Sequence, residues 1–120
     1  MKNYLFILLI CLGCASKKEI VVPKFESKIV SNEKLSCRAI FVDTDKVWLG
    51  MDKGRYGFYD KKKDTLVVKT IQSVSNTTEF RSIAATKDAI FILAVGNPAK
   101  LIKIDKKSLQ ETIVYQEENE

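Results

Sequence analysis

The residues that could do chemistry in this 120-residue chain are few, and histidine is not among them. Without His there is no Ser-His-Asp or Cys-His catalysis, and no imidazole to bind a metal or to act as a pH switch. The three cysteines are Cys11, Cys14 and Cys37. Cys37 lies in an apolar, strand-like run with no histidine base, so we expect a buried, inert thiol. We predict no catalytic residues, no metal site and no cofactor in this chain.

Acidic and basic side chains cluster where turns are expected. Asp43, Asp45 and Asp52 lack the spacing of an EF-hand loop, so we interpret them as residues of turns at strand ends. The lysines of 61–63 and 106–107 have no interleaved aromatic residues, which favours solvated hairpins over a nucleic-acid surface. We predict no nucleic-acid partner.

The first residues have the order of a targeting signal. A short basic start, residues 1–3, precedes nine apolar residues, 4–12, which are too few to span a bilayer but suit a secretory signal. The following residues, Leu12-Gly13-Cys14, resemble the end of a bacterial lipobox, in which the signal is cut before a lipidated cysteine. Cys11 stands where that pattern usually has leucine. The alternatives are an ordinary signal peptide with incidental cysteines, or a buried N-terminal strand.

The lipobox resemblance implies an address and a domain division. Residues 1–13 are then a lipoprotein signal peptide, 14–27 a tether, and 28–120 the folded part. Acyl chains on Cys14 would hold that part at a membrane, since each buried methylene contributes about 0.8 kcal/mol. We expect export and a lipid anchor in a bacterial membrane, facing the periplasm or in the outer membrane.

After the tether, short runs rich in β-branched and aromatic residues alternate with polar turns, which predicts an all-β fold. Glu19–Val22 is a candidate short strand ended by Pro23. The main strands are expected near residues 28–30, 37–42, 46–51, 56–59, 65–71, 80–84, 89–95, 101–104 and 112–115. No stretch keeps helical spacing over three turns, so we predict essentially no helix.

Two of these runs, 47–49 and 89–95, are apolar without alternation, which is typical of strands covered on both faces. Residues 54–58 contain two glycines, which we interpret as a hairpin turn.

The chain contains an internal repeat. Arg38 is matched by Arg81 at a spacing of 43, and the same offset pairs Trp48 with Phe91. A second block, 59–62, matches 104–107 at a spacing of 45. Four strands in each such unit is the pattern of a β-propeller blade. We therefore predict about two four-stranded antiparallel blades, near 36–72 and 79–116, with Trp48 and Phe91 filling the space between blades.

Three stretches, 80–83, 94–101 and 112–115, resemble bacterial propeller proteins similar to photosystem II assembly/stability factors and to sialidase-type Asp-box (BNR) repeat proteins. Proteins of that group are often labelled oxidoreductases, although the repeat itself implies no redox chemistry. The turns at 60–66 and 105–109 keep an Asp but lack the Gly and Trp of the Asp-box. The resemblance therefore does not transfer Asp-box chemistry.

The repeat gives Arg38 and Arg81 the same position, at the start of the first strand of each unit. The propeller resemblance implies that this strand lines a central channel, where basic patches meet partners. Arginine binds carboxylates and phosphates through two hydrogen bonds, so the expected partner is an anionic protein or glycan. The alternative is a solvated or locally paired arginine.

Two units are fewer than a closed propeller has, and uncovered edges favour self-association. We therefore expect a fragment of a longer propeller protein that acts as a membrane-anchored interaction or scaffold module of the cell envelope. One alternative is a complete small lipoprotein, folded as a sandwich or paired with copies of itself. Another is a propeller-type enzyme, a glycosidase or a so-called oxidoreductase, whose active site lies outside this chain.

Overall fold

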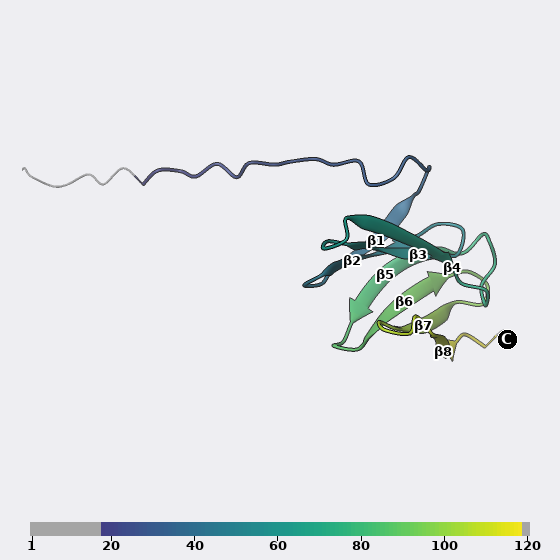
Figure 1. Cartoon of the computed structure of the whole chain (residues 1–120). Helices are drawn as coiled ribbons and strands as arrows, with labels where there is room; N and C mark the ends of the chain where they lie inside the picture. Colours follow the sequence, from purple (N-terminus) through teal and green to yellow (C-terminus); the bar gives the residue numbers. More distant parts are fainter. Residues whose placement is uncertain (1–17, 119–120) are drawn as a thin grey trace, which may run out of the picture.

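The computed structural model describes residues 18–118, and within them the protein is all-β, with eight strands and no helix. Figure 1 shows two sheets in succession, with the N-terminal segment extending away from them. The strands are β1 (Cys37–Val42), β2 (Lys46–Met51), β3 (Arg55–Asp60), β4 (Thr65–Thr70), β5 (Glu79–Ala85), β6 (Ala89–Val95), β7 (Lys100–Asp105) and β8 (Glu111–Gln116).

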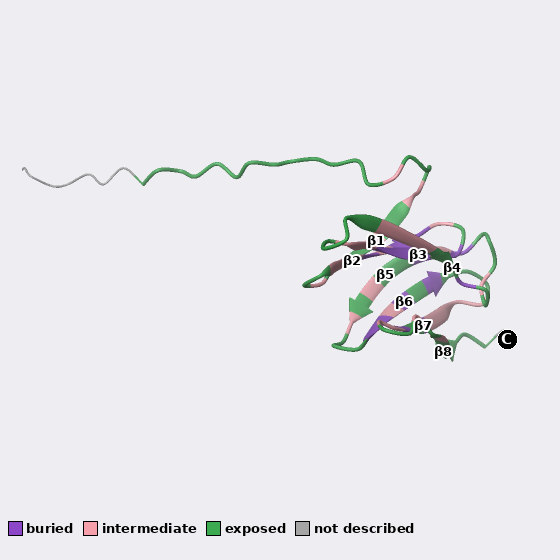
Figure 2. Ribbon diagram, in the orientation of Figure 1, coloured by how far each residue is buried: buried purple, intermediate pink, exposed green. Residues whose placement is uncertain are grey.

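Each sheet is a four-stranded antiparallel meander in chain order, β1-β2-β3-β4 and β5-β6-β7-β8. The prediction of an all-β chain is confirmed, and all eight of these strands were expected within two residues of their observed ends. The strands expected near 28–30 and at Glu19–Val22 are wrong, because residues 18–36 have no regular structure and are mostly exposed (Figure 2). These segments have no strand beside them with which to pair.

The two sheets repeat the same local structure at the offsets found in the sequence. The hydrogen bond from Asp43 N to Lys46 O recurs from Thr86 N to Ala89 O, and both are 2.8 Å. The bond from Lys61 N to Asp45 O recurs between Lys106 and Asp88, both at 2.9 Å. The residue with left-handed backbone conformation in the turn before the fourth strand also recurs, with φ 55° at Asp64 and φ 59° at Leu109. The internal repeat is therefore a repeat of structure and not of composition alone.

The turn from β2 to β3 is a tight hairpin. Lys53 and Gly54 both have positive φ, 57° and 64°, and Arg55 N donates to Asp52 O at 3.1 Å. Two successive left-handed residues make a type I′ turn, which matches the twist of the strands beside it. The sequence prediction of a turn at 52–54 is correct, but the wider turn expected over 54–58 is wrong, since β3 begins at Arg55.

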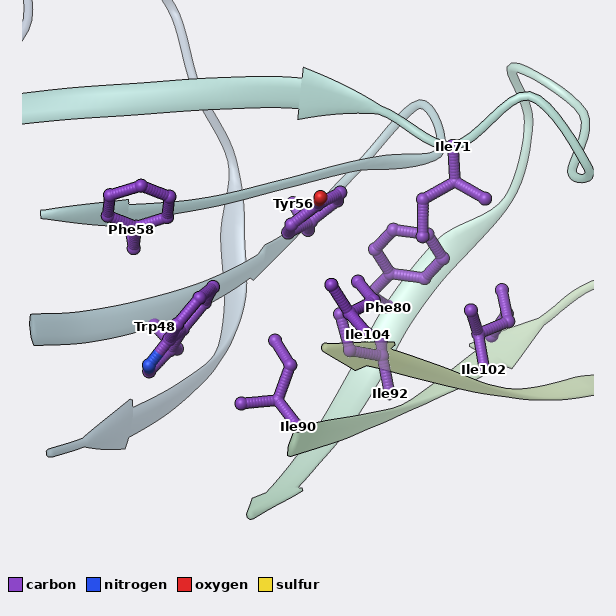
Figure 3. Packing of buried hydrophobic residues seen from close by; sticks show 10 residues of the cluster. Trp48, Tyr56, Phe58, Ile71, Phe80, Ile90, Ile92, Ile102 and Ile104 are labelled. Carbon is purple, nitrogen blue, oxygen red and sulfur yellow. The ribbon is translucent and has the colours of Figure 1, made fainter. Parts of the chain in front are cut away.

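The core lies between the two sheets and contains side chains from both (Figure 3). Trp48 and Phe58 come from β2 and β3, with ring centroids 4.9 Å apart. Ile90 and Ile92 face them from β6 and are fully buried. The fully buried large side chains are Trp48, Met51, Tyr56, Ile71, Phe80, Ile90, Ile92, Ile102 and Ile104.

The sheets pack face to back, so corresponding residues lie on the same face of each sheet but have different surroundings. At the offset of 43, Trp48 corresponds to Phe91, yet Trp48 is fully buried and Phe91 is only half-buried, on the far side of its sheet. Strand alternation puts Ile90 and Ile92 on the opposite face of β6 from Phe91. Trp48 therefore lies between the two sheets, whereas Phe91 lies on the face of the second sheet that points away from the first. For the same reason β2 and β6 are each covered on one face only within the described residues.

Gly50 lies on β2 in close contact with β5. A Cβ at this position would lie 3.0 Å from the Cβ of Phe80 and 3.4 Å from Cδ1 of Ile83, both on β5. With Phe80 opposite, a side chain here would require its neighbours to shift. The glycine therefore permits the two sheets to meet near β2 and β5.

Candidate functional site: an arginine pair on the first strands

The two arginines singled out by the repeat occupy the same structural feature in both sheets. In the pairing of β1 with β2, Cys37 lies opposite Met51 and Ala39 lies opposite Gly50. No residue of β2 therefore lies opposite Arg38. The register of β5 and β6 skips Arg81 in the same way. Each arginine is therefore the extra residue of a β-bulge, a device that redirects a side chain out of the regular alternation.

The bulges bring the two arginines to one carboxylate. A guanidinium nitrogen of Arg81 lies 2.5 Å from Glu79, and one of Arg38 lies 3.7 Å from the other oxygen of the same carboxylate. The side chains of Arg38 and Arg81 remain about half exposed, at 45% and 52%. Strands β1 and β5 lie beside each other, so the cluster joins the two sheets. We call Arg38, Glu79 and Arg81 the arginine cluster.

The cluster has two positive groups and one negative group, so its net formal charge is positive. Each guanidinium has five N–H donors in a planar fork, and each forms an ion pair with Glu79 through one nitrogen. Among residues 18–118 neither arginine forms an ion pair with any other carboxylate. Exposed donors therefore remain for an anionic group arriving from solvent.

The two arginines occupy equivalent positions in the two sheets, as the repeat predicted. Both also pair locally with Glu79, which was the alternative interpretation. Sequence reasoning missed Glu79, which is the residue that holds the two arginines together. A signal was present, since Glu79 starts the same strand as Arg81 and lies two positions before it. The first sheet has Ser36 at the corresponding position, so the repeat gave no second carboxylate to draw attention to it.

A second polar cluster lies at the other end of the sheet interface. A pocket of about 190 Å³ is lined by Asp43, Asp45, Lys46, Trp48 and Lys106, together with Thr44. The Lys106 ammonium donates to the Asp43 carboxylate at 2.6 Å and to the Thr86 carbonyl at 2.7 Å, which links the two sheets.

Lys106 holds the pKa of the Asp43 carboxyl below its usual range. The interpretation of Asp43 as a residue of a strand-end turn agrees with its bond from Thr44 N at 2.9 Å. The charges in this pocket already serve to join the sheets.

The lysine-rich turns are organised by aspartates. The Asp60 carboxylate accepts from the backbone of Lys62 and Lys63, each at 3.0 Å, and Asp105 accepts from Lys107 and Ser108 at 2.9 and 2.7 Å. These backbone bonds lower the pKa of both aspartates. Lys62 pairs with Asp45 at 3.0 Å and its side chain stays largely exposed, whereas Lys106 reaches Asp43 on the other sheet and is only 15% exposed. The interpretation of solvated hairpins therefore fits the turn at 61–63 but is wrong for Lys106.

Cys37 does not lie where the sequence suggested. It is exposed, at the beginning of β1, although the corresponding Phe80 of β5 is fully buried beside the same bulge, because no other sheet covers this face of the first sheet in the described residues. The prediction of a buried thiol is therefore wrong. Partial covering of its sulfur raises the pKa of Cys37, which makes the thiolate scarce at neutral pH. Cys14, the predicted lipidation residue, lies outside the described residues.

Two buried polar atoms have no hydrogen-bond partner in the described part of the chain, Trp48 Nε1 and the Tyr56 hydroxyl. Burial and the nearby charge of Glu111 raise the pKa of Tyr56 to about 12. Such a hydroxyl stays neutral in the physiological range and acts as part of the core.

No protein-family model matches the sequence, and no curated protein matches it either. Among residues 18–118, no three acidic or cysteine side chains are grouped so that they could hold a metal ion. The same residues include no helix that could cross a membrane. The arginine cluster is the candidate site that the geometry supports best.

Proposed function

We propose that this protein is an exported, lipid-anchored interaction module whose two sheets are blades of a β-propeller-like stack. In this proposal the arginine cluster receives a carboxylate or another anionic group of an envelope protein or glycan. Cys14 attaches the module to a bacterial membrane, and residues 14–27 serve as its tether. The observation that carries the proposal is the convergence of Arg38 and Arg81, from equivalent bulges, on one half-exposed cluster of net positive charge.

The propeller-like arrangement is supported by three features. The two units repeat the same four-stranded meander, the same bulge and the same turn bonds. Their first strands lie beside each other, as the inner strands of neighbouring blades do. The sheets pack face to back, which is the packing that permits further units to be added at either side.

The arginine cluster is suited to binding because its charges are held but not fully satisfied. Glu79 lies between the two guanidinium groups without burying them. An arriving carboxylate can therefore accept hydrogen bonds from the exposed donors, in competition with Glu79. Exposed charge pairs contribute about 0.2–1 kcal/mol each, so we expect weak binding that falls with added salt.

The test measures binding of an acidic peptide and of a uronic-acid oligosaccharide to the chain by isothermal titration calorimetry. Arg38→Gln and Arg81→Gln should each weaken binding by up to about five-fold, and the double variant by more. Lys87→Gln, in the β5–β6 turn, is the matched control that removes one exposed charge elsewhere. Equal losses in the control and in the arginine variants would show that only net charge matters and would overturn the proposed site.

A further inference from the structure

The outer face of the β1–β4 sheet is apolar and uncovered in the described part of the chain. Ile40 pairs with Leu49 and Val42 pairs with Val47 across β1 and β2, so the four side chains lie together on the face opposite Trp48. Ile40 and Val42 are 61% and 65% exposed. The N-terminal segment contacts this sheet at its turns, where Lys28 pairs with Asp64 and the carbonyl of Ser36 accepts from Asp52 N at 3.1 Å.

This outer face is a copy of a face that is already buried. At the offset of 43, its four residues correspond to four residues of the other sheet that face the core. Ile40 and Val42 correspond to Ile83 and Ala85, which pack against the core, and Val47 and Leu49 correspond to Ile90 and Ile92, which form part of it. The type of side chain is kept at each position, since all eight residues are aliphatic. The outer face of the first sheet therefore has the character of the face that the second sheet presents to the core.

The converse holds for the outer face of the β5–β8 sheet. Leu93 and Phe91 correspond to Gly50 and Trp48, which lie on the inner face of the first sheet. Leu93 is 42% exposed, and Phe91 is half-buried. This face is apolar along β6, although Lys103, opposite Phe91, stands where the inner face of the first sheet has Phe58. The two outer faces thus correspond in position to the two sides of the internal interface.

We propose that copies of this chain associate head to tail, with the outer face of the β5–β8 sheet of one copy packed on the outer face of the β1–β4 sheet of the next. A second copy is the occupant that fits, because every copy carries both halves of an interface that the fold already forms once. The continuous apolar runs in β2 and β6 agree with this, since they are typical of strands covered on both faces. Head-to-tail contacts of this kind generate rings when the rotation closes.

The internal interface predicts which residues meet between copies. A Cβ on Gly50 would lie 3.0 Å from the Cβ of Phe80. The corresponding residues are Leu93 on one outer face and Cys37 on the other. The proposal therefore places Leu93 of one copy near the exposed Cys37 of the next. Cys37 is next to Arg38 in the chain, but cross-linking and anion affinity are measured separately, so the two proposals can fail independently.

The experiment is disulfide cross-linking of the full chain carrying Leu93→Cys, oxidised in membranes with copper phenanthroline and run on a non-reducing gel. Because each chain then has a thiol on both outer faces, a ladder of dimers, trimers and larger species is expected. The matched control, Leu93→Cys with Cys37→Ser, should give no ladder. Emission of Trp48 from a buried environment verifies that each variant is folded. A chain that stays monomeric after oxidation overturns the proposal, and so does a ladder that persists without Cys37.

Discussion

The packing of the two sheets predicts a specific loss of stability when Ile92 is truncated. Ile92 is fully buried on β6 between the sheets. Ile92→Ala removes three carbons, which costs about 2.4 kcal/mol in transfer free energy. A residual cavity of about 50 Å³ adds roughly 1.2 kcal/mol. The expected destabilisation is therefore about 3.5 kcal/mol, a large part of the total stability of a small domain.

Urea unfolding followed by tryptophan fluorescence measures this loss, because Trp48 is the only tryptophan and is fully buried at the sheet interface. With a slope of about 1.5 kcal/mol per molar urea, the midpoint should fall by roughly 2 M. The matched control is Leu49→Ala, at the corresponding position of β2 on the outer face. At concentrations where the chain is monomeric its midpoint should fall by less than half as much. Equal shifts for the two variants would refute face-to-back packing.

Three further predictions follow from single groups. Tyr56→Phe removes a buried hydroxyl that has no partner, so the free energy of unfolding should stay the same or rise by up to about 1 kcal/mol, and a clear fall in the urea midpoint would contradict this. Asp60 and Asp105 have lowered pKa values in the fold, so the stability that they contribute is present above their unfolded pKa and is lost as the pH falls through the lowered values. The double variant Asp60→Asn with Asp105→Asn keeps an oxygen acceptor in each turn but removes the titrating carboxyl. It should therefore lose less stability between about pH 5 and pH 2, which acid titration of the Trp48 fluorescence measures. An unchanged acid transition would argue against this role. Cys14→Ala should move the protein from the membrane fraction to the soluble fraction, and unchanged fractionation would defeat the lipid anchor.

The eight strands could be predicted from the sequence because each is a short run of β-branched and aromatic residues bounded by polar turns. Asp60 and Asp105 marked two of those turns, and their side chains do cap the backbone there. The offsets of 43 and 45 were visible as well, and they correspond to real hydrogen bonds in both sheets.

The errors have a common physical origin, since composition reports how apolar a strand is but not what covers each face. Trp48 and Phe91 match in the repeat and lie on the same face of their sheets, but among the described residues only the face that carries Trp48 is covered by another sheet. Cys37 was expected inside because its strand is apolar, but it lies on a face of the first sheet that nothing covers in the described residues, whereas the corresponding Phe80 is buried. The role of Glu79 depends on the approach of two strands that are far apart in the chain, and no local pattern encodes such a contact.

The central claim, that the arginine cluster receives an anionic group, is tested most directly by changing the carboxylate that now occupies it. Glu79 competes with any external anion for the same two guanidinium groups. The measurement is the affinity of the acidic peptide for Glu79→Gln compared with the unchanged chain, with folding verified by Trp48 emission. The account predicts binding about two- to five-fold tighter, as expected from the removal of a competing charge in an exposed pair. Unchanged or weaker binding by the folded variant would contradict it.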